Sequence, residues 1–339
     1  MEADAFSESL WVDLRQRATS NPAMAPAEPL EYRGNGRPYT CAMVSRDGSL
    51  HLLIDPESPL REDLRNPAVA GLRAGLLLDC LVIGRARQTY IDVRCDSQQF
   101  RRVFTVIAKQ IALAILRDMA LPSVAVNSVI DIWRRFWLRQ PTSALSEDEQ
   151  LGLIGELTVL ERLYREGVRD AVLAWGGPLG SPRDFELRGL GIEVKSTCGT
   201  RRRHQVNNIR QLERGDDRVL LLVSLLAQRT SEGGISLPER ISLVAGAIQT
   251  ADEQEVYYDR LAASGYTPAH DEEYAGTRFV LTEPVAFIVD DDFPRITPDM
   301  FCNALSSRVY AVHYGVDRDG LRCFQMPSDD FTALLRDFA

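Results

Sequence analysis

The sequence predicts a two-domain α/β protein in which a mixed central sheet flanked by helices follows a smaller N-terminal α/β domain. Short apolar runs of strand length alternate along the chain with longer stretches that repeat apolar residues at helical spacing. A composition with 45% hydrophobic and 26% charged residues is typical of a globular protein. A break that contains Pro122 separates the two parts. We therefore expect an accessory domain over residues 1–120 and a second domain over residues 121–339.

The accessory domain should begin with a β-hairpin. Residues 39–44 and 50–54 are apolar runs that flank Asp47 and Gly48, and an Asp-Gly pair between such runs favours a tight turn. Two more strands and a helix are expected at residues 76–83, 90–93 and 98–116. The sequence leaves open whether this domain recognises target DNA, a modification or a partner subunit.

The second domain should alternate helices with strands. Ser146, followed by three acidic residues, is a good N-terminal cap, and Gly167 is a good C-terminal stop. These signals predict a helix over residues 147–166, after an earlier helix at residues 124–138. Two strands, a helix, a buried strand and a helical region should follow. The remaining elements are expected at residues 279–289 (strand), 298–313 (helix and strand) and 331–338 (short helix).

Composition and charge exclude several classes of protein. No run of uncharged apolar residues approaches the roughly 20 needed to span a bilayer, and the N-terminus lacks the apolar segment of a secretory signal. The six cysteines show no zinc-ligand spacing and suit a reducing cytoplasm. The formal net charge of −9 argues against a protein that coats nucleic acid through bulk charge. We expect a cytoplasmic protein without membrane association, in which a local basic surface could still bind nucleic acid.

Lysine is rare in this chain. Of 39 Lys and Arg residues, only Lys109 and Lys195 are lysines. Lysine offers a compact ammonium group with a shiftable pKa, whereas the arginine guanidinium stays protonated and planar. Lys109 belongs to a helical pattern and is expected on its solvated face. Lys195 is therefore the candidate for a role that arginine cannot fill.

The segment that leads to Lys195 predicts an antiparallel hairpin with two chemically different faces. Two strands flank a glycine-containing turn. If Leu187 faces Ile192, side-chain alternation separates apolar from charged residues. In this register Asp184 faces Lys195, and Glu186 faces Glu193. The apolar face would hold Phe185, Leu187, Ile192 and Val194, and the charged face Asp184, Glu186, Glu193 and Lys195.

Two interpretations of the charged face remain open. A half-exposed sheet commonly carries charged side chains on its wet side. Alternatively, the three carboxylates form a cation site, because neighbouring like charges repel each other and a divalent cation relieves the repulsion. Mg²⁺ typically takes one or two carboxylates together with water and phosphate oxygens. Spacing alone does not decide between the two interpretations.

Asp184, followed by Glu193-x-Lys195 on an apolar strand, resembles the PD-(D/E)XK signature of restriction-endonuclease-like nucleases. The sequence GLIGEL at residues 152–157 resembles the helix that supplies an additional acidic residue in many members of that superfamily. Together with SPRDF, GIEVKST and the later FPR, it resembles a bacterial family of PD-(D/E)XK motif proteins linked with phage defence and restriction gene sets. The resemblance covers residues 151–314. Arg183 departs from it by separating the proline from the aspartate.

The resemblance implies a restriction-endonuclease-like core and a nuclease that depends on Mg²⁺ or Mn²⁺. Asp184 and Glu193 would be the primary metal ligands, and Glu156 would lie behind them or bind a second metal. Lys195 would position or help to deprotonate the attacking water. Gln211, on the helix expected after the hairpin, resembles a glutamine that faces the active site in several superfamily members.

Two helix-interior glycines, Gly152 and Gly155, accompany Glu156. Such glycines cost up to about 1 kcal/mol each relative to alanine. Their presence therefore suggests that another backbone approaches this helix closely, which distinguishes Glu156 from an ordinary exposed helix glutamate.

A basic stretch surrounds and follows the hairpin. Between residues 183 and 214, eight basic residues stand against four acidic ones, a local positive excess in an acidic chain. A basic patch beside an acidic metal site suits a phosphate backbone, although a solvated loop would carry the same residues. The candidates for contact with nucleic acid are Arg201, Arg202, Arg203 and His204.

We therefore expect a metal-dependent endodeoxyribonuclease of restriction or phage defence. Its substrate would be DNA, its partners other subunits of a defence system, and its assembly a homodimer that cuts both strands. One alternative is a non-catalytic DNA-binding or scaffolding subunit of a multi-component defence complex. Another is an RNA-directed nuclease, since no residue distinguishes a contact to the ribose 2′-OH. Whether Glu186 joins the metal site stays open.

Overall fold

The computed structural model describes residues 8–20, 25–32, 38–56, 64, 72–80, 88–97, 101–116, 120–138, 143–214, 219–300, 312–317 and 320–338. The chain divides into two compact units, Met1–Gln140 and Pro141–Ala339, whereas the sequence placed the boundary after residue 120. Helix α3 (Pro122–Leu138) accounts for the difference. It packs against α2 (Arg101–Leu116) and β5 (Gln88–Cys95), and so it belongs with the N-terminal unit.

The N-terminal unit is built on a five-stranded antiparallel sheet with the order β1-β2-β3-β5-β4. Besides β5, its strands are β1 (Ala27–Tyr32), β2 (Pro38–Val44), β3 (Leu50–Ile54) and β4 (Leu72–Cys80). The predicted hairpin is confirmed, because Val44 pairs with Leu50. Helix α1 (Glu8–Ser20) packs Trp11 on Phe104 of α2, with 5.7 Å between the ring centroids.

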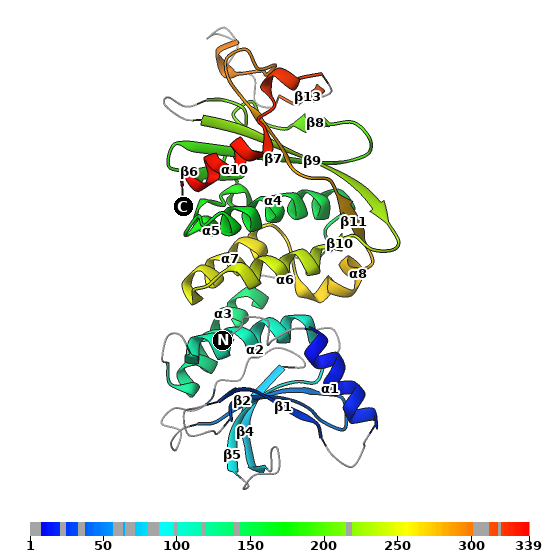
Figure 1. Cartoon of the computed structure of the whole chain (residues 1–339), viewed down its shortest axis with the longest axis vertical. Coiled ribbons are helices and arrows are strands. Elements are labelled where there is room, and N and C mark those ends of the chain that lie inside the picture. Colours follow the sequence, from blue (N-terminus) through cyan, green and yellow to red (C-terminus); the bar gives the residue numbers. More distant parts are fainter. Residues whose placement is uncertain are drawn as a thin grey trace. The chain divides into compact units, whose positions relative to one another are not determined.

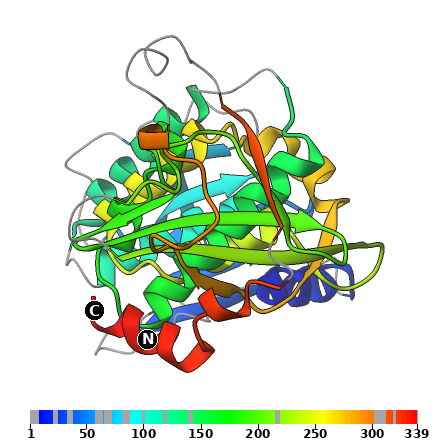
Figure 2. The same cartoon turned by 90° about the horizontal axis from the view of Figure 1, so that it is seen from above.

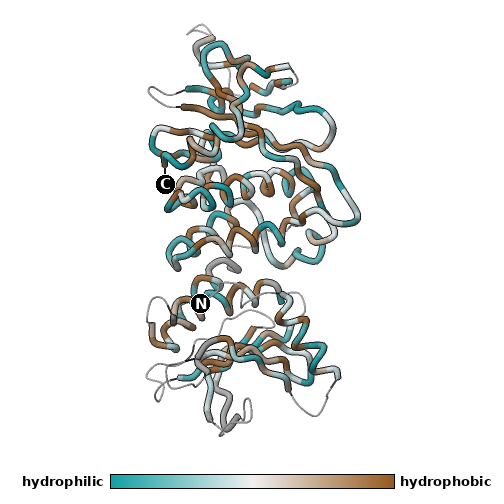
Figure 3. Tube along the Cα trace, in the orientation of Figure 1, coloured by the Kyte–Doolittle hydropathy of each residue, from teal (hydrophilic) through white to brown (hydrophobic). Residues whose placement is uncertain are grey.

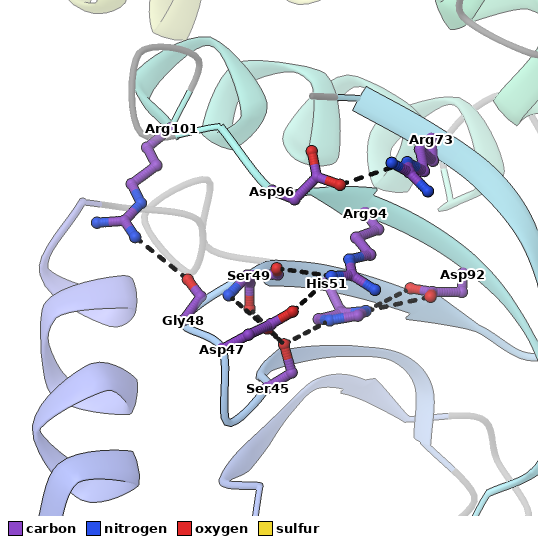
Figure 4. Close-up of polar contacts among 10 residues, drawn as sticks. All are labelled: Ser45, Asp47, Gly48, Ser49, His51, Arg73, Asp92, Arg94, Asp96 and Arg101. Atoms are coloured by element: carbon purple, nitrogen blue, oxygen red, sulfur yellow. Dashed lines mark hydrogen bonds and ion pairs between the residues drawn. The ribbon is translucent and has the colours of Figure 1, made fainter. Parts of the chain in front are cut away.

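A polar network holds the β2–β3 hairpin (Figure 4). His51 Nδ1 lies 2.9 Å from Asp92 Oδ1, and His51 Nε2 lies 3.0 Å from Ser45 Oγ. This order resembles a serine-hydrolase triad. However, Ser45 Oγ donates at 2.5 Å to Asp47, whose other oxygen accepts from Arg94. Ser45 Oγ is thus engaged by a carboxylate as well as by the histidine, and the network ties the β2–β3 turn to β5.

The C-terminal unit contains the predicted mixed sheet, with the order β10-β11-β9-β7-β6 and with β12 paired to β9 (Figures 1 and 2). The central strands β7 (Leu190–Cys198) and β9 (Val219–Thr230) are parallel. The other strands pair antiparallel: β6 (Phe185–Leu187), β10 (Ile235–Ser236), β11 (Arg278–Leu281) and β12 (Val285–Ile288). The single strand predicted at residues 279–289 is thus two strands separated by residues 282–284.

Two different layers cover the faces of this sheet (Figure 1). Helix α4 (Glu147–Arg165) packs on β7 and on α6 (Leu237–Ala247). On the other face, β8 (Arg203–Val206) pairs with β13 (Tyr314–Asp317), and their Val206 and Val316 join Leu220 and Leu222 of β9 in one buried cluster. Hydrophobic residues concentrate along the central strands (Figure 3). The sheet is therefore buried on both sides.

The remaining elements surround this core. They are α5 (Ala171–Ala174), α7 (Ala251–Ala263), α8 (Asp271–Ala275) and α10 (Ser328–Arg336). The predicted start of α4 is confirmed, because Glu149 N donates to Ser146 Oγ while Glu149 Oε2 accepts from Ser146 N. Residues 301–311, on which the predicted late helix falls, lie outside the described residues. None of the helices that the structure describes has the length and apolar character needed to cross a bilayer.

Candidate active site

The predicted hairpin is formed by β6 and β7 at the edge of the sheet. Leu187 pairs with Leu190 and not with Ile192, so the predicted register is wrong by two residues. Gly189 makes the shorter turn with a φ of +86°, a conformation that favours glycine. A shift of two residues leaves every side chain on its expected face, since side chains alternate with period 2. The charged and apolar faces are therefore as predicted.

Asp184 directly precedes β6 and is held from two sides. Its Oδ2 accepts a 2.7 Å hydrogen bond from the backbone N–H of Val194 on β7. Its backbone carbonyl accepts from the N–H groups of Gly176 and Gly177, at 2.9 and 3.2 Å. Burial raises the pKa of the Asp184 carboxyl to about 6, although the Val194 N–H and the charge of Lys195 act in the opposite direction. Asp184 Oδ1 accepts no hydrogen bond from the residues that the structure describes.

Glu193 and Lys195 form an ion pair inside the protein. Lys195 Nζ lies 2.7 Å from Glu193 Oε1, and their side chains are 16% and 1% exposed. Glu193 Oε2 is buried and accepts no hydrogen bond within the described part of the chain. Burial, followed by the charge of Asp184, raises the pKa of Glu193 well above its ordinary value. Burial alone would lower the pKa of Lys195, but the nearby carboxylates outweigh it and raise that pKa, so the lysine is charged.

Glu156 reaches the same cluster from α4. The indole Nε1 of Trp175 donates to Glu156 Oε2 at 2.7 Å, and Trp175 itself is fully buried beside the ring of Tyr257. A Cβ atom at Gly177 would lie 2.8 Å from Asp184 Oδ1 and 2.9 Å from Glu156 Oε2. Gly177 therefore leaves the space in which the two carboxylates meet. Burial, followed by the charge of Asp184, raises the pKa of Glu156 to about 8.

Close packing of α4 on β7 places Glu156 at this position. A Cβ atom at Gly155 would overlap with the hydroxyl of Ser196 and lie 3.5 Å from Val194 Cγ1. At Gly152, by contrast, a Cβ atom would meet nothing within 4 Å. A close approach to the helix is therefore present at Gly155, although side chains and not the backbone of β7 make it, and it is absent at Gly152.

The cluster fits a hard divalent cation. It offers carboxylate oxygens, the ligands that Mg²⁺ prefers, and Glu193 Oε2 is a buried acceptor without a partner in the described region, which is rare in folded proteins. Asp184, Glu193 and Glu156 would hold the ion. Among the described residues, no three acidic, histidine or cysteine side chains already lie at metal-binding spacing. In this arrangement Lys195 is the group that neutralises Glu193.

Gln211 lies beside Lys195, but in a turn and not on a helix. Its Oε1 lies 3.5 Å from Lys195 Nζ and accepts a 3.1 Å hydrogen bond from the backbone N–H of Asn207. Asn208 Oδ1 accepts from the N–H of Arg210 at 3.0 Å, a local bond that favours a turn over a helix. The predicted helix is therefore wrong, while Gln211 meets the lysine through the turn that replaces it.

Arg201 and Arg203 are the two exposed members of the predicted nucleic-acid contacts. Arg203 Nε lies 2.8 Å from Asp317 Oδ2 on the neighbouring strand β13. Both residues of this pair are largely exposed, so it is an easily screened surface ion pair. The guanidinium groups of Arg201 and Arg203 are therefore accessible to an anionic partner.

Arg202 and His204 have a different environment. Arg202 donates to the carbonyl and the hydroxyl of Ser224 at 2.6 and 2.9 Å. His204 is 3% exposed, and its Nε2 lies 2.6 Å from the same hydroxyl. Ser224 is the register partner of Lys195 on β9. The structure therefore places His204 in the interior, beside the strand that carries Lys195.

Glu186 does not join the carboxylate cluster. It is paired with Gly191 across the hairpin, and its carboxylate lies 3.1 Å from Arg183 Nη1. Arg183, the residue that departs from the motif, lies over Gly191 and donates to the backbone carbonyl of Glu213. It thereby ties the hairpin to the turn that carries Gln211.

Sequence reasoning missed Trp175 and Gly177. Both belong to the segment Trp-Gly-Gly-Pro at residues 175–178, between α4 and the hairpin. A tryptophan directly before two glycines and a proline forms an unusual turn, and this pattern could have drawn attention to the segment. The sequence pattern does not identify the acceptor of the indole N–H, because Glu156 is 19 residues away in sequence.

Comparison with protein families gives a match over most of the chain. The model of a family described as "Putative PD-(D/E)XK family member, (DUF4420)" matches residues 13–319. The match begins within the N-terminal unit, so the family similarity extends beyond residues 151–314, where the motifs lie. No curated protein and no solved structure matches the chain.

Proposed function

The chain belongs to the PD-(D/E)XK family DUF4420, and on this premise we propose that it is a metal-dependent endodeoxyribonuclease. The observation that carries the proposal is the meeting of three buried carboxylates, Asp184, Glu193 and Glu156, with a single charged lysine at one edge of the sheet. Perturbed ionisable groups cluster in this way at catalytic sites more often than elsewhere. Together with the family, this cluster supports hydrolysis of phosphodiester bonds.

Each residue has a role that follows from its contacts. Asp184 and Glu193 would hold a Mg²⁺ or Mn²⁺ ion, with Glu156 as a further ligand. A divalent cation bound there would supply a Lewis acid and lower the pKa of a coordinated water. Lys195 would supply a positive charge that stabilises negative charge on the reacting phosphate. Gln211 orients the lysine head group, and Trp175 orients the carboxylate of Glu156.

The substrate and partners are proposed from the surface beside the cluster. Arg201 and Arg203 would contact the DNA backbone, because guanidinium groups neutralise phosphates. Arg202 and His204 would support the strand that carries the lysine and would not touch DNA. A homodimer would place two such sites on the two strands. We further propose a cytoplasmic role in restriction or phage defence, with other subunits of a defence system as partners.

The test is cleavage of plasmid, phage and modified DNA in the presence of Mg²⁺ or Mn²⁺. Asp184→Asn and Lys195→Met should each lose activity by at least about a hundredfold, since removal of one preorganised charge at an active site commonly costs this much. Glu186→Gln is the matched control, because it removes a charge from the same hairpin face outside the cluster. Its activity should stay within about twofold.

Three outcomes separate the proposal from its alternatives. Cleavage of RNA and not of DNA in the same assay would identify an RNA-directed nuclease. DNA binding without any cleavage, with candidate partner subunits present, would identify a non-catalytic subunit. Loss of cleavage in Glu186→Gln to the same extent as in Asp184→Asn would show that the cluster is not the active site.

A further inference from the structure

A polar pocket lies on the side of α4 that faces away from the carboxylate cluster. Its volume is about 240 Å³, and it is enclosed by α4, α6 and residues 282–284 between β11 and β12. Four residues of α4 line it, at two, five, six and nine positions after Glu156: Thr158, Glu161, Arg162 and Arg165. At about 100° per residue, this spacing places them on the opposite face of the helix from Glu156. Strands β11 and β12 pair with the edge of β9 that lies away from β7.

Three arginines are among the residues that line this pocket: Arg162, Arg165 and Arg240. The lining also includes two acids, Glu161 and the exposed Glu283. Arginine therefore exceeds acid by one within the lining, in a chain whose overall charge is −9. The local net charge of the pocket lining is therefore opposite in sign to the net charge of the whole chain.

Glu161 is shared between two of the arginines. Its Oε1 lies 2.7 Å from Arg165 Nη2, and its Oε2 pairs with Arg240 Nη1. One carboxylate thus stands between two guanidinium groups. The third arginine, Arg162, donates to the Thr332 hydroxyl at 2.8 Å and lies 4.7 Å from the centre of the Phe331 ring, and it pairs with no carboxylate in the described part of the chain. The positive charge of the pocket is therefore only partly neutralised.

Burial makes this imbalance costly. The side chains of Arg240 and Glu161 are only 12% and 19% exposed, and Arg240 Nε is buried without a hydrogen-bond partner among the described residues. Burial lowers the pKa of Arg240 even though Glu161 pairs with it. A buried charge with incomplete compensation is unfavourable unless a further partner supplies the opposite charge.

We propose that this pocket binds a small phosphate-bearing anion. Planar guanidinium groups match the oxygens of phosphate two at a time, which makes an arginine cluster well suited to this ligand. The volume of the pocket limits the size of the ligand, because sites for drug-sized ligands typically measure about 300–1,000 Å³. The pocket is below that range, so it takes inorganic phosphate, pyrophosphate or the phosphate end of a mononucleotide.

The experiment is calorimetric titration of the intact protein with phosphate, pyrophosphate and AMP, at low salt and without divalent cations. We expect saturable binding of at least one of them. Tighter binding of AMP than of phosphate would identify a nucleotide as the ligand, and equal binding would identify the free anion. Calorimetry measures anion binding without any nuclease activity. A failure of the anion-binding proposal can therefore be distinguished from a failure of the proposed function.

Two variants should change the affinity in opposite directions. Arg165→Gln, at a largely exposed position, should weaken binding about tenfold because it removes one of the three cations. Glu161→Gln should tighten binding several-fold, because it releases guanidinium donors of Arg165 and Arg240 from their internal carboxylate. Arg169→Gln is the matched control, since Arg169 is an exposed arginine that follows the same helix and lies outside this pocket.

The control variant and a second substitution keep the proposal falsifiable. Thermal melting should show that Arg165→Gln and Glu161→Gln are folded. If Glu161→Gln is unfolded, Arg162→Lys replaces it, and loss of the planar guanidinium should weaken binding several-fold. The proposal is overturned if none of the three anions binds, if Arg169→Gln weakens binding as much as Arg165→Gln, or if folded Glu161→Gln binds no more tightly.

Discussion

Carboxylates as deeply buried as those of Glu193 and Glu156 require a proton or a cation beside them. Within the described structure only Lys195 lies within ion-pair distance of the cluster, and it pairs with Glu193 alone. The pKa values of Asp184, at about 6, and of Glu156, at about 8, are raised chiefly by burial. A divalent cation would supply the missing positive charge. The same residues therefore set both the acid–base behaviour of the protein and its affinity for metal.

Replacement of Trp175 by phenylalanine tests how Glu156 is held. The change keeps a buried aromatic ring but removes the N–H that donates to Glu156 Oε2. A hydrogen bond to a charged group contributes roughly 1.5–3 kcal/mol, so we expect Mn²⁺ affinity, measured by calorimetry, to fall about tenfold or more. Trp133→Phe removes an indole bond of the same 2.7 Å length in the N-terminal unit and should leave this affinity unchanged.

A double-mutant cycle shows whether Trp175 acts through Glu156. In a Glu156→Gln background, Trp175→Phe should weaken Mn²⁺ binding by less than twofold, because the charged acceptor is already gone. A tenfold effect in both backgrounds would instead mean that Trp175 stabilises the site by packing alone.

The pH dependence of stability follows from the raised carboxyl pKa values. The folded pKa of Glu156, about 8, lies above its ordinary value of 4.5, so the folded state binds the proton more tightly than the unfolded state. This contribution to stability is fully present below about pH 4.5 and is lost as the pH rises through 8; the raised pKa of Asp184 acts in the same direction. In a metal chelator, the melting temperature should therefore fall between pH 5 and 8.5.

Glu156→Gln is the variant that isolates this effect. It removes the carboxyl group whose pKa is raised to about 8 and reduces repulsion on Asp184, so its melting temperature should depend less on pH over the same range. Parallel curves for the two proteins would assign the pH dependence to other groups.

The position of helix α4 depends on one glycine. Gly155 lies against Ser196 of β7 without room for a Cβ atom, whereas Gly152, three residues earlier, faces open space. Alanine is favoured over glycine inside a helix by about 1 kcal/mol. The two positions therefore offer the same substitution with opposite consequences.

Gly152→Ala should raise the free energy of unfolding by up to about 1 kcal/mol, whereas Gly155→Ala should lower it by about 1–3 kcal/mol, the usual cost of overpacking. Urea denaturation measures both changes. Gly155→Ala should also weaken Mn²⁺ binding, because the helix must move away from β7 and carry Glu156 with it. Equal stability changes for the two variants would contradict the close packing of α4.

The elements also show which parts of the fold the sequence could predict. The capping box of α4 and the two faces of the hairpin are local patterns, and both are confirmed. The register of the hairpin is not, because Gly189 permits a turn two residues tighter than the one expected. The helix expected after β7 is strand β8 and a turn, because pairing with the distant strand β13 outweighs local preference. The first error thus comes from a local turn, and the second from a contact between segments far apart in the sequence.

The candidate site combines local and distant contributions. Asp184, Glu193 and Lys195 were proposed from a local pattern on two adjacent strands together with its resemblance to the PD-(D/E)XK signature, because alternation alone left two interpretations open. Trp175 could not be predicted, because its role depends on a hydrogen bond to another element. The interior position of His204 was missed for a similar reason, since it depends on Ser224 of β9. Basic sequence context alone does not distinguish an exposed arginine from a buried histidine.

The carboxylate cluster belongs entirely to one of the two compact units of the chain. Glu156, Asp184, Glu193, Lys195 and Gln211 all lie within Pro141–Ala339, and so does the buried cluster that covers β9. The family match nevertheless extends into the N-terminal unit from residue 13. The carboxylate cluster therefore lies in one unit, whereas the family similarity includes residues of both.

A fragment of residues 141–339 should fold and bind Mn²⁺ with the affinity of the intact chain, because it keeps the whole sheet and every residue of the cluster. Cooperative melting and calorimetry are the measurements. A fragment that starts at residue 121, the boundary expected from the sequence, is the sharper comparison. It adds α3 without its partner α2, so Val126, Ile130 and Trp133, which are buried in the intact unit, would be exposed to solvent. Exposed apolar surface of this kind promotes association, so this longer fragment should aggregate at concentrations at which the shorter one stays monodisperse. If the shorter fragment failed to fold or bound Mn²⁺ more than tenfold more weakly, the C-terminal unit would depend on the N-terminal one for its stability.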